Sequence, residues 1–413
     1  MRLLYTVQRY GVDIVGGSEA ACRMAAERLV ERGHEVHVLT SCAHRFNDWA
    51  DEYPAGSTIS AGVHVHRLPV RWPRDPALFA ALDHRAANGP RPIPIAEQER
   101  WMRAVGPELD GHRAWLRSNA SQFDAVIHMT YLYATTTTGL PLVAGRLPVV
   151  LQPTAHDEPS IRVQRFDTIV RLADSFIFLT PEEEAFVRRR FFLDPVGVVS
   201  GIGFGPQPQG DPSAIRARLG LGEDPYLVYV GRIDPAKGAV EAWHFFDAYK
   251  RRRGGRLKFV VAGEAVVELP PHPDVVSAGF LSEHDKRSLL AGSTALVQPS
   301  QLESFSIVLC EAWLQGRPAL VHASSPVLVG QAMRSRGAIP YAGYARFEAA
   351  VDLLTADPGI GDALGAAGRR YVATNYSWPV VINRIEEAVE LARARFEQRR
   401  GLPATAAAVH ARG

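Results

Sequence analysis

The stretch Glu303-Ser304-Phe305-Ser306-Ile307-Val308-Leu309-Cys310-Glu311 follows the apolar lead-in Leu296-Val297-Gln298-Pro299-Ser300. A short apolar run that ends in proline and serine is typical of a buried strand, and the second apolar run is long enough to begin a helix. We therefore expect a strand, a tight turn and a helix. Glu303 would lie at the mouth of a sheet, and Glu311 would fall inside the helix about two turns further on.

The start of this expected helix is suited to an anion. Ser306, Ile307 and Val308 would present unpaired backbone amides together with the positive end of the helix dipole. Carboxylates accept hydrogen bonds from vicinal diols, so Glu303 could bind the sugar beyond a diphosphate and Glu311 a ribose on the other side. The pattern predicts a sugar-nucleotide site, although two glutamates at this spacing also occur by chance as an ordinary surface pair.

A second segment, residues 226–238, points to the same ligand. A buried-looking strand ends in Gly231, and Arg232 and Lys237 follow in one loop before a helix expected from Ala239. Arginine offers a fork for phosphate oxygens and lysine a point charge. Ligands of open α/β sheets bind at the carboxyl ends of strands, where this loop would lie. A pair of surface cations is the alternative.

With these two motifs, the second half of the chain resembles the family 4 glycosyltransferases of the GT-B fold, which are retaining enzymes that use nucleotide sugars. Their Glu-x7-Glu segment is matched by Glu303 to Glu311, and their Gly-Arg-x4-Lys-Gly loop is matched by the residues from Gly231 to Gly238. Both the order and the spacing agree.

The resemblance implies a role for each matched residue. Arg232 and Lys237 would contact the donor diphosphate, Glu303 would act beside the transferred sugar, and Glu311 would bind the ribose. The loop from Gly279 to Ser282, with Phe280, would contact the base. One departure is that Ser304 and Ser306 stand where many members have glycine around the central aromatic residue, which adds Cβ atoms where the backbone approaches phosphate.

The first half opens on a short strand followed by a glycine pair, Gly16-Gly17, and a helical pattern that ends near Gly33. Such a pair lets the backbone approach a ligand, although a plain turn into a helix is the default. The resemblance implies that Gly16, Gly17 and Ser18 close over the diphosphate and the acceptor. His156 follows a strand at residues 148–152 and resembles the family's histidine that faces the donor sugar, which implies that it hydrogen-bonds the sugar and stabilises an oxocarbenium-like transition state.

Residues 70–116 are the least regular part of the sequence and contain Trp72 and Trp101 close to several arginines. Long insertions in α/β enzymes commonly build substrate loops. Trp72, Trp101 and Ser18 are therefore candidates for acceptor contacts or for contact with a membrane surface. A solvated loop packed by its own tryptophans is the alternative, and the sequence does not identify the acceptor.

Composition favours a globular protein of two domains. The chain has 413 residues, 46% of them hydrophobic, and a formal net charge of +2, which gives no general affinity for nucleic acid. Three cysteines argue for a reducing compartment and against a disulfide framework or a zinc site. No signal peptide or membrane-spanning run is visible, so we expect a cytoplasmic protein that could associate with a membrane peripherally.

The expected architecture is α/β: two Rossmann-like domains with a cleft between them and a C-terminal helix that crosses back to the first domain. The expected ranges are 1–195 for an acceptor-binding domain, 196–375 for a nucleotide-sugar-binding domain, 376–398 for the crossover helix and 399–413 for a disordered tail. The sequence does not predict the oligomeric state.

The expected activity is the transfer of a sugar from a UDP- or GDP-linked donor to a hydroxyl acceptor, which could be a small molecule, a glycan or lipid-linked. The resemblance implies that transfer proceeds with retention. No cofactor is expected, and no metal ion is expected because Arg232, Lys237 and the helix amides would offset the charge of the diphosphate and no Asp-x-Asp pair is present. Glu303 and Glu311 are too far apart to serve as the carboxylate pair of a hydrolase. A nucleotide-sugar 2-epimerase and a non-catalytic nucleotide-sugar-binding protein are the alternatives.

Overall fold

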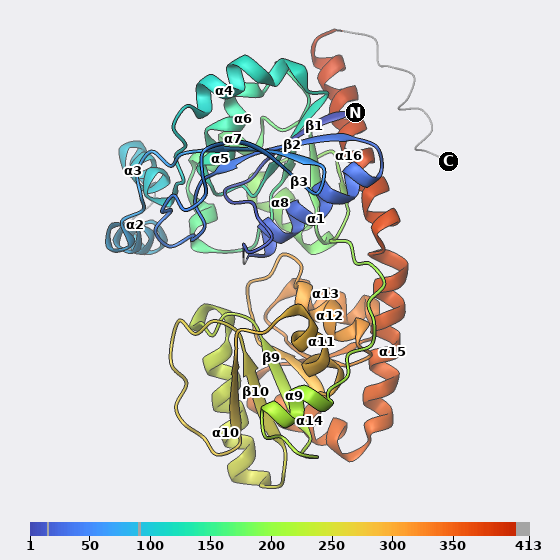
Figure 1. The fold of residues 1–413 in the computed structure, drawn as a ribbon. Coiled ribbons are helices and arrows are strands. Elements are labelled where there is room, and N and C mark those ends of the chain that lie inside the picture. Colours follow the sequence, from blue (N-terminus) through green and yellow to red (C-terminus); the bar gives the residue numbers. More distant parts are fainter. Residues whose placement is uncertain (15, 90–91, 402–413) are drawn as a thin grey trace. The chain divides into compact units, whose positions relative to one another are not determined.

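The computed structural model describes residues 1–14, 16–89 and 92–401 (Figure 1). The chain divides into two compact units. Unit 1 comprises Met1–Gly203 together with the chain from Trp378 onward, and unit 2 comprises Phe204–Ser377. The expected boundary between residues 195 and 196 falls inside unit 1, because the strand at Gly197–Val199 pairs with the sheet of that unit. Most of the tail expected at 399–413 lies outside the described residues.

Unit 1 is built on an eight-stranded sheet with the order β3-β4-β2-β1-β5-β6-β7-β8. Its strands are β1 (Arg2–Thr6), β2 (Glu35–Ser41), β3 (Gly56–Ser60), β4 (Val63–Leu68), β5 (Ala125–Met129), β6 (Val149–Gln152), β7 (Ser175–Phe178) and β8 (Gly197–Val199). All neighbours are parallel except β3 and β4. The central strands are almost wholly buried and apolar, as expected for parallel strands covered on both faces.

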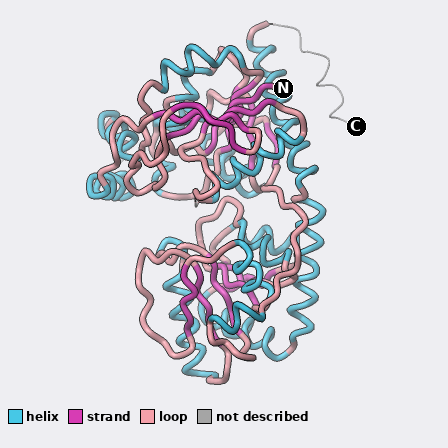
Figure 2. The backbone as a smooth tube through the Cα atoms, in the orientation of Figure 1, coloured by secondary structure: helices cyan, strands magenta, loops and turns pink. Residues whose placement is uncertain are grey.

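Helices cover both faces of this sheet (Figure 2). They are α1 (Gly17–Glu31), α2 (Pro76–Asn88), α3 (Ile95–Val105), α4 (His112–Asn119), α5 (Ala134–Thr137), α6 (Gly139–Val143), α7 (Arg165–Val170), α8 (Pro181–Phe191) and α16 (Trp378–Arg399), with 3₁₀ turns η1 (Ala120–Gln122) and η2 (Pro159–Arg162). One face packs against α1 and α16, where Val381, Ile385 and Val389 enter the core. Hence the C-terminal helix belongs to the first unit.

Residues 70–116 are more regular than the sequence suggests, because most of them form α2, α3 and the start of α4. The Asp75 carboxylate caps α2 by accepting from the amides of Ala77 and Leu78, and Pro76 occupies the first turn. Proline is tolerated there because that amide has no partner inside the helix.

Unit 2 is built on a six-stranded sheet with the order β11-β10-β9-β12-β13-β14, in which all neighbours are parallel. Its strands are β9 (Tyr226–Val230), β10 (Lys258–Ala262), β11 (Val275–Gly279), β12 (Ala295–Gln298), β13 (Ala319–His322) and β14 (Ala338–Tyr341). Its helices are α9 (Ser213–Arg218), α10 (Ala239–Arg253), α11 (Glu283–Ala291), α12 (Ile307–Leu314), α13 (Pro326–Ser335), α14 (Gly343–Ala356) and α15 (Pro358–Asn375), with the 3₁₀ turn η3 (Pro235–Lys237). One face packs against α10 and α14. Two doubly wound sheets confirm the predicted fold class.

The order of strands locates a site in unit 2. From β9 the chain winds outward through β10 and β11, then returns to place β12 on the other side of β9. Ligands of open α/β sheets bind outside the carboxyl ends of the strands at such a reversal. The loops that follow β9 and β12 are the two segments that the sequence singled out. Among the described helices, none is both long enough and apolar enough to cross a membrane.

Candidate active site

A glycine allows the loops after β9 and β12 to pack closely against each other. Gly238 ends η3 with φ 75°, and a Cβ at this position would lie 2.5 Å from the carbonyl oxygen of Pro299. Only glycine combines this left-handed conformation with so close an approach. The Lys-Gly pair of the first motif is therefore needed to bring its cation beside the second motif.

Lys237 and Glu303 form an ion pair across these loops. The Nζ of Lys237 lies 3.0 Å from Oε1 of Glu303, whose side chain is 12% exposed, whereas that of Lys237 is 39% exposed. Arg232 lies on the same loop, with Nη2 3.2 Å from Oδ2 of Asp234. The structure thus brings Arg232, Lys237 and Glu303 together at the carboxyl end of the sheet.

Helix α12 begins where the sequence predicts an anion-binding end. Ser306 is its N-cap with φ 75°, and no side chain caps the amides of Ile307 and Val308. A left-handed conformation costs a serine about 1–2 kcal/mol relative to its usual backbone. The Oγ of Ser306 accepts a 2.7 Å hydrogen bond from Nε2 of Gln298, which offsets part of that cost. The departure from glycine at this position is therefore accommodated, and the first-turn amides stay clear of a capping side chain.

Glu311 lies in α12 and is buried, with 8% of the residue exposed. Its Oε1 lies 2.8 Å from Nζ of Lys286 in α11. Burial raises the pKa of Glu311, and Lys286 partly offsets that rise. Burial lowers the pKa of Lys286, but Glu311 and Glu283, whose Oε1 lies 2.9 Å from Nζ, together outweigh it and the net shift is upward. We treat the two groups as a charged pair, which the sequence did not reveal because Lys286 lies in a different helix.

Three strand ends beside these loops carry glycine, at Gly231, Gly263 and Gly279. A Cβ on Gly263 would lie 2.0 Å from the carbonyl oxygen of Gly231, so the two strand ends nearly touch. Phe280 follows the third glycine and is 71% exposed. An exposed aromatic ring next to a backbone free of side chains is available to stack on a planar base.

In unit 1, a buried ion pair between Arg9 and Glu19 supports the predicted glycine loop. Nε of Arg9 donates to Oε1 of Glu19 at 2.9 Å, and both residues are at least nine-tenths buried. Oε2 of Glu19 accepts from Oγ of Ser18 at 2.7 Å, and a Cβ on Gly16 would lie 2.4 Å from this oxygen. A Cβ on Gly17 would meet nothing within 4 Å. Gly16 is therefore required for packing, whereas the space at Gly17 is open.

His156 follows β6 in a loop that a second buried carboxylate fixes. Oε1 of Glu183 accepts from the amide of Ala155 and Oε2 from that of Leu179, both at 2.6 Å. Nδ1 of His156 lies 3.9 Å from Oε1 of Glu158 and has no hydrogen-bond partner among the described residues. This buried and unpartnered ring nitrogen makes His156 a candidate for a ligand contact, whereas no local sequence pattern marked Glu183.

Glu183 makes the stability of unit 1 depend on pH. Burial raises its pKa to about 8 from 4.5, although the two amides lower it in part. Between these values the folded chain holds a proton that the unfolded chain has lost, so the free energy of unfolding falls as pH rises, by up to about 1.4 kcal/mol per pH unit. We expect Glu183→Gln to remove this slope. Urea unfolding at about pH 5.5 and pH 8 measures it, with Glu182→Gln as the control; equal slopes in wild type and Glu183→Gln would contradict the assignment.

The two tryptophans proposed for the acceptor differ in exposure. Trp72 is 54% exposed and lies under the guanidinium of Arg71, 4.7 Å from the ring centroid. Trp101 is 2% exposed, donates through Nε1 to Asp83 at 3.2 Å and packs edge-on against Phe166. Of these two, Trp72 is the one open to a ligand.

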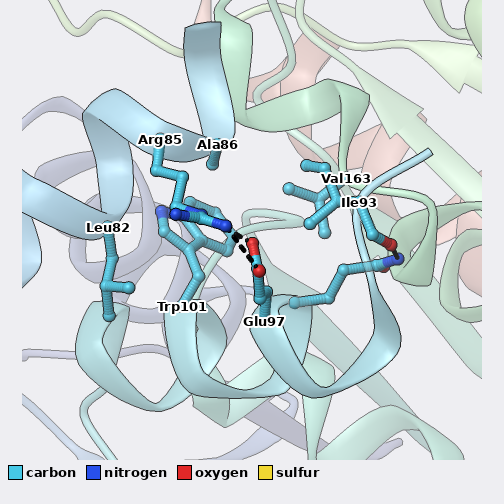
Figure 3. A pocket seen from close by; sticks show the side chains of 8 residues that line it. Leu82, Arg85, Ala86, Ile93, Glu97, Trp101 and Val163 are labelled. Carbon is cyan, nitrogen blue, oxygen red and sulfur yellow. Dashed lines mark hydrogen bonds and ion pairs between the residues drawn. The ribbon is translucent and has the colours of Figure 1, made fainter. Parts of the chain in front are cut away.

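Trp101 lines a small cavity between α2 and α3 (Figure 3). Arg85 donates two 2.8 Å hydrogen bonds to the carboxylate of Glu97 beside it. The cavity volume is about 10 Å³, which is room for roughly one water molecule. It is too small for a sugar ring.

Comparison with known proteins matches both units. The family described as "Glycosyl transferase 4-like domain" matches residues 16–200, and the family described as "Glycosyl transferases group 1" matches residues 212–371. These two ranges cover most of the chain.

Individual relatives agree with the families. The alpha-D-kanosaminyltransferase of Streptomyces kanamyceticus is 27% identical over 329 residues, which cover 73% of this chain and 80% of the relative. A D-inositol 3-phosphate glycosyltransferase of Streptomyces bingchenggensis is 28% identical over 405 residues, which cover 89% and 83%.

Solved structures share the fold. Sucrose-phosphate synthase from Thermosynechococcus elongatus superposes with a TM-score of 0.68 at 17% identity, covering 94% of this chain and 97% of that one. HepE from Anabaena, in complex with UDP and glucose, gives 0.67 at 14% identity, covering 94% and 98%. The chain therefore belongs to the group 1 glycosyltransferases of family 4 and is an enzyme of the GT-B fold that uses a nucleotide-sugar donor.

Proposed function

We propose that this enzyme transfers a sugar from a UDP- or GDP-linked donor to an acceptor hydroxyl, with retention and without a metal ion. The observation that carries the proposal is the strand reversal of unit 2, where two cations, a carboxylate and an uncapped helix end lie together. The acceptor would be a small molecule, a glycan or a lipid-linked sugar.

Each part of the donor has a suitable partner. The diphosphate would bind to the amides of Ser306, Ile307 and Val308 and to the cations Arg232 and Lys237. The ribose diol would donate to the carboxylate of Glu311, whose charge Lys286 already stabilises. Phe280 would contact the base, and Gly231 would leave room for the pyrophosphate.

The family resemblance also assigns donor contacts to two features of unit 1, the glycine loop and His156. Gly17 would approach the diphosphate, because nothing fills the space at its Cα. His156, with one ring nitrogen unpartnered, would hydrogen-bond the transferred sugar. Ser18 and Trp72 are the better acceptor candidates, since Trp101 is enclosed.

The chemistry follows from where charge develops. As the glycosidic bond breaks, negative charge grows on the leaving diphosphate, and Lys237, Arg232 and the helix amides stabilise it. In a front-face reaction the acceptor oxygen forms the new bond on the side from which the diphosphate leaves, and a phosphate oxygen takes the acceptor proton. Glu303 would hold the sugar hydroxyls while positive charge develops on the ring. These groups supply the charge that a metal ion would otherwise supply.

UDP is the donor nucleotide to test first, because the structurally similar Anabaena protein was solved in complex with UDP and glucose. We expect UDP or its sugars to raise the thermal midpoint selectively when compared with GDP and ADP at equal concentration. The shift should disappear in Lys237→Ala and persist in Lys258→Ala, which removes a lysine from the first residue of β10. No shift with any nucleotide would contradict the donor-site assignment.

The alternatives are separated by product analysis. A 2-epimerase would convert the sugar of the bound donor without an acceptor, which NMR of the incubated donor detects. A binding protein would show the thermal shift but release no nucleoside diphosphate with any acceptor. A transferase releases the diphosphate only when an acceptor hydroxyl is present, apart from slow hydrolysis.

A further inference from the structure

The outer strands of unit 1 carry a polar cluster on one face of the sheet. β2 places Glu35 and His37 on this face, because alternate residues of a strand point the same way. β4 runs parallel to β2 and pairs His64 with His37 and His66 with Leu39. A Glu-x-His segment and a His-x-His segment therefore lie side by side, so that three imidazoles and one carboxylate share a face whose centre is apolar.

Packing holds these rings in place. The ring of His37, a residue only 6% exposed, stacks on His64 with 4.5 Å between centroids and 11° between planes, and on His66 with 5.2 Å and 12°. Phe123 meets His37 edge-on at 5.0 Å, and Trp115 lies 5.1 Å from His66. The rings of His37 and His64 are nearly parallel, so one of them must turn before both can direct a nitrogen at the same ion.

The donor atoms of three residues converge. One ligand atom each from Glu35, His37 and His64 lies within 4.8 Å of the other two. A tetrahedral zinc site with Zn–N distances of about 2.0–2.1 Å requires neighbouring ligand atoms about 3.3 Å apart. Nε2 of His37 and Oε1 of Glu35 are already 2.9 Å apart, and the Glu35 side chain is 49% exposed and can turn.

A chain of hydrogen bonds from His37 through His66 to Ser57 can exchange its donors and acceptors when a metal binds. Nδ1 of His37 lies 2.9 Å from Nε2 of His66, and Nδ1 of His66 lies 2.7 Å from Oγ of Ser57. Without a metal, the Ser57 hydroxyl and the Nε2–H of His66 donate along the chain, and Nε2–H of His37 donates to Glu35. With a metal on Nε2 of His37, both tautomers reverse and Ser57 accepts. Every polar atom in the chain is satisfied in either state.

We propose that Glu35, His37 and His64 bind one divalent transition-metal ion of the zinc type, with His66 and Ser57 orienting His37 and with water completing the shell. Two imidazoles and a carboxylate suit zinc, and a second hydrogen bond from a ligating histidine is the usual support. Magnesium and calcium prefer oxygen ligands alone.

This site is separate from the transferase chemistry. Glu35 begins β2, at the amino-terminal edge of the sheet, whereas the glycine loop and His156 follow the carboxyl ends of β1 and β6. A metal here would join β2 to β4 and so reinforce the outer part of the sheet. Nε of Arg2 lies 3.0 Å from Oε1 of Glu35 and competes for this oxygen.

The test is zinc titration of the full chain, without an affinity tag and freed of metal with a chelator that is then removed. We expect calorimetry to show one zinc per chain with a dissociation constant in the micromolar range or tighter, cobalt to give the visible absorption of a tetrahedral complex, and magnesium to give no heat. Zinc should also raise the thermal midpoint.

Single substitutions test which residues bind the zinc ion. His64→Gln and Glu35→Gln should each weaken zinc binding at least tenfold, and His66→Gln, which acts through His37, roughly 10–100-fold. His244→Gln, at an exposed position of α10, is the matched control and should bind as wild type does. Glu35 is half exposed at the start of its strand, so Glu35→Gln stays informative if His64→Gln does not fold. Wild-type zinc affinity in Glu35→Gln, or no heat in the wild type at about 100 µM zinc, overturns the proposal.

Discussion

Lys237→Ala is expected to lower kcat for sugar transfer by about 10²–10³-fold, the usual loss when one preorganised donor to a developing negative charge is removed. Lys237 is paired with Glu303 at 3.0 Å. When the donor binds, the ammonium would also face the diphosphate, and its contribution grows as the glycosidic bond breaks. The loss should therefore appear in kcat more than in KM.

The control for this experiment is Lys258→Ala. Lys258 belongs to the same unit but begins β10, where it pairs with Asp274 at 2.7 Å, away from the carboxyl ends of the strands. Both variants remove one positive charge, so a general electrostatic effect would lower both rates alike. Steady-state release of the nucleoside diphosphate gives kcat and KM. A Lys237→Ala rate within a few-fold of wild type would remove Lys237 from the catalytic site.

The second large effect concerns the buried pair of Glu311 and Lys286. Lys286→Met alone leaves the buried carboxylate of Glu311 without its lysine, and such a change costs about 3–5 kcal/mol of the free energy of unfolding. Glu311→Leu should cost less, because Lys286 keeps a 2.9 Å contact with Glu283. The double variant replaces both charges by apolar groups of similar size and should recover most of that stability. The side chains are 11% and 17% exposed, so solvent screens the pair only weakly.

Among these variants, the affinity for the donor should not change in parallel with the free energy of unfolding. The double variant lacks the carboxylate that we assign to the ribose, and loss of a hydrogen bond to a charged group is worth about 1.5–3 kcal/mol, or roughly 10–100-fold in Kd. Denaturant unfolding and calorimetry with the nucleotide measure the two quantities separately. A double variant that is stable and binds with wild-type affinity would show that Glu311 is structural only.

Local sequence patterns predicted most of the fold. The apolar run at 226–230 is β9, the run that begins at Leu296 lies in β12 (Ala295–Gln298), and the helix expected after Ser306 is α12. These elements have short-range signals, namely a run of buried side chains bounded by a breaker. The helices within residues 70–116 were not predicted, because prolines that stand at or just before helix starts, as at Pro76 and Pro94, resemble the prolines of loops.

Sequence motifs singled out residues whose loops the structure brings together, whereas residues defined only by a contact were missed; the roles of all these residues in donor binding are proposals. Arg232, Lys237 and Glu303 lie together as expected, because the strand order brings the loops after β9 and β12 to one place. Lys286 and Glu183 carry no local pattern that marks them, since each is defined by a partner on another element. The histidine cluster of β2 and β4 was missed for the same reason, and because the number of cysteines gives no information about histidine ligands.

The pairing of both motif carboxylates with lysine has a practical consequence. The chain contains only four lysines, Lys237, Lys250, Lys258 and Lys286, and all other basic side chains of this strength are arginines. Reductive methylation with isotopically labelled formaldehyde would therefore add probes at four ε-amines and the chain's amino terminus alone. Two of these probes would sit in the proposed donor site, one on an open side chain and one on an enclosed side chain, so that a simple spectrum could follow sugar-nucleotide occupancy during turnover.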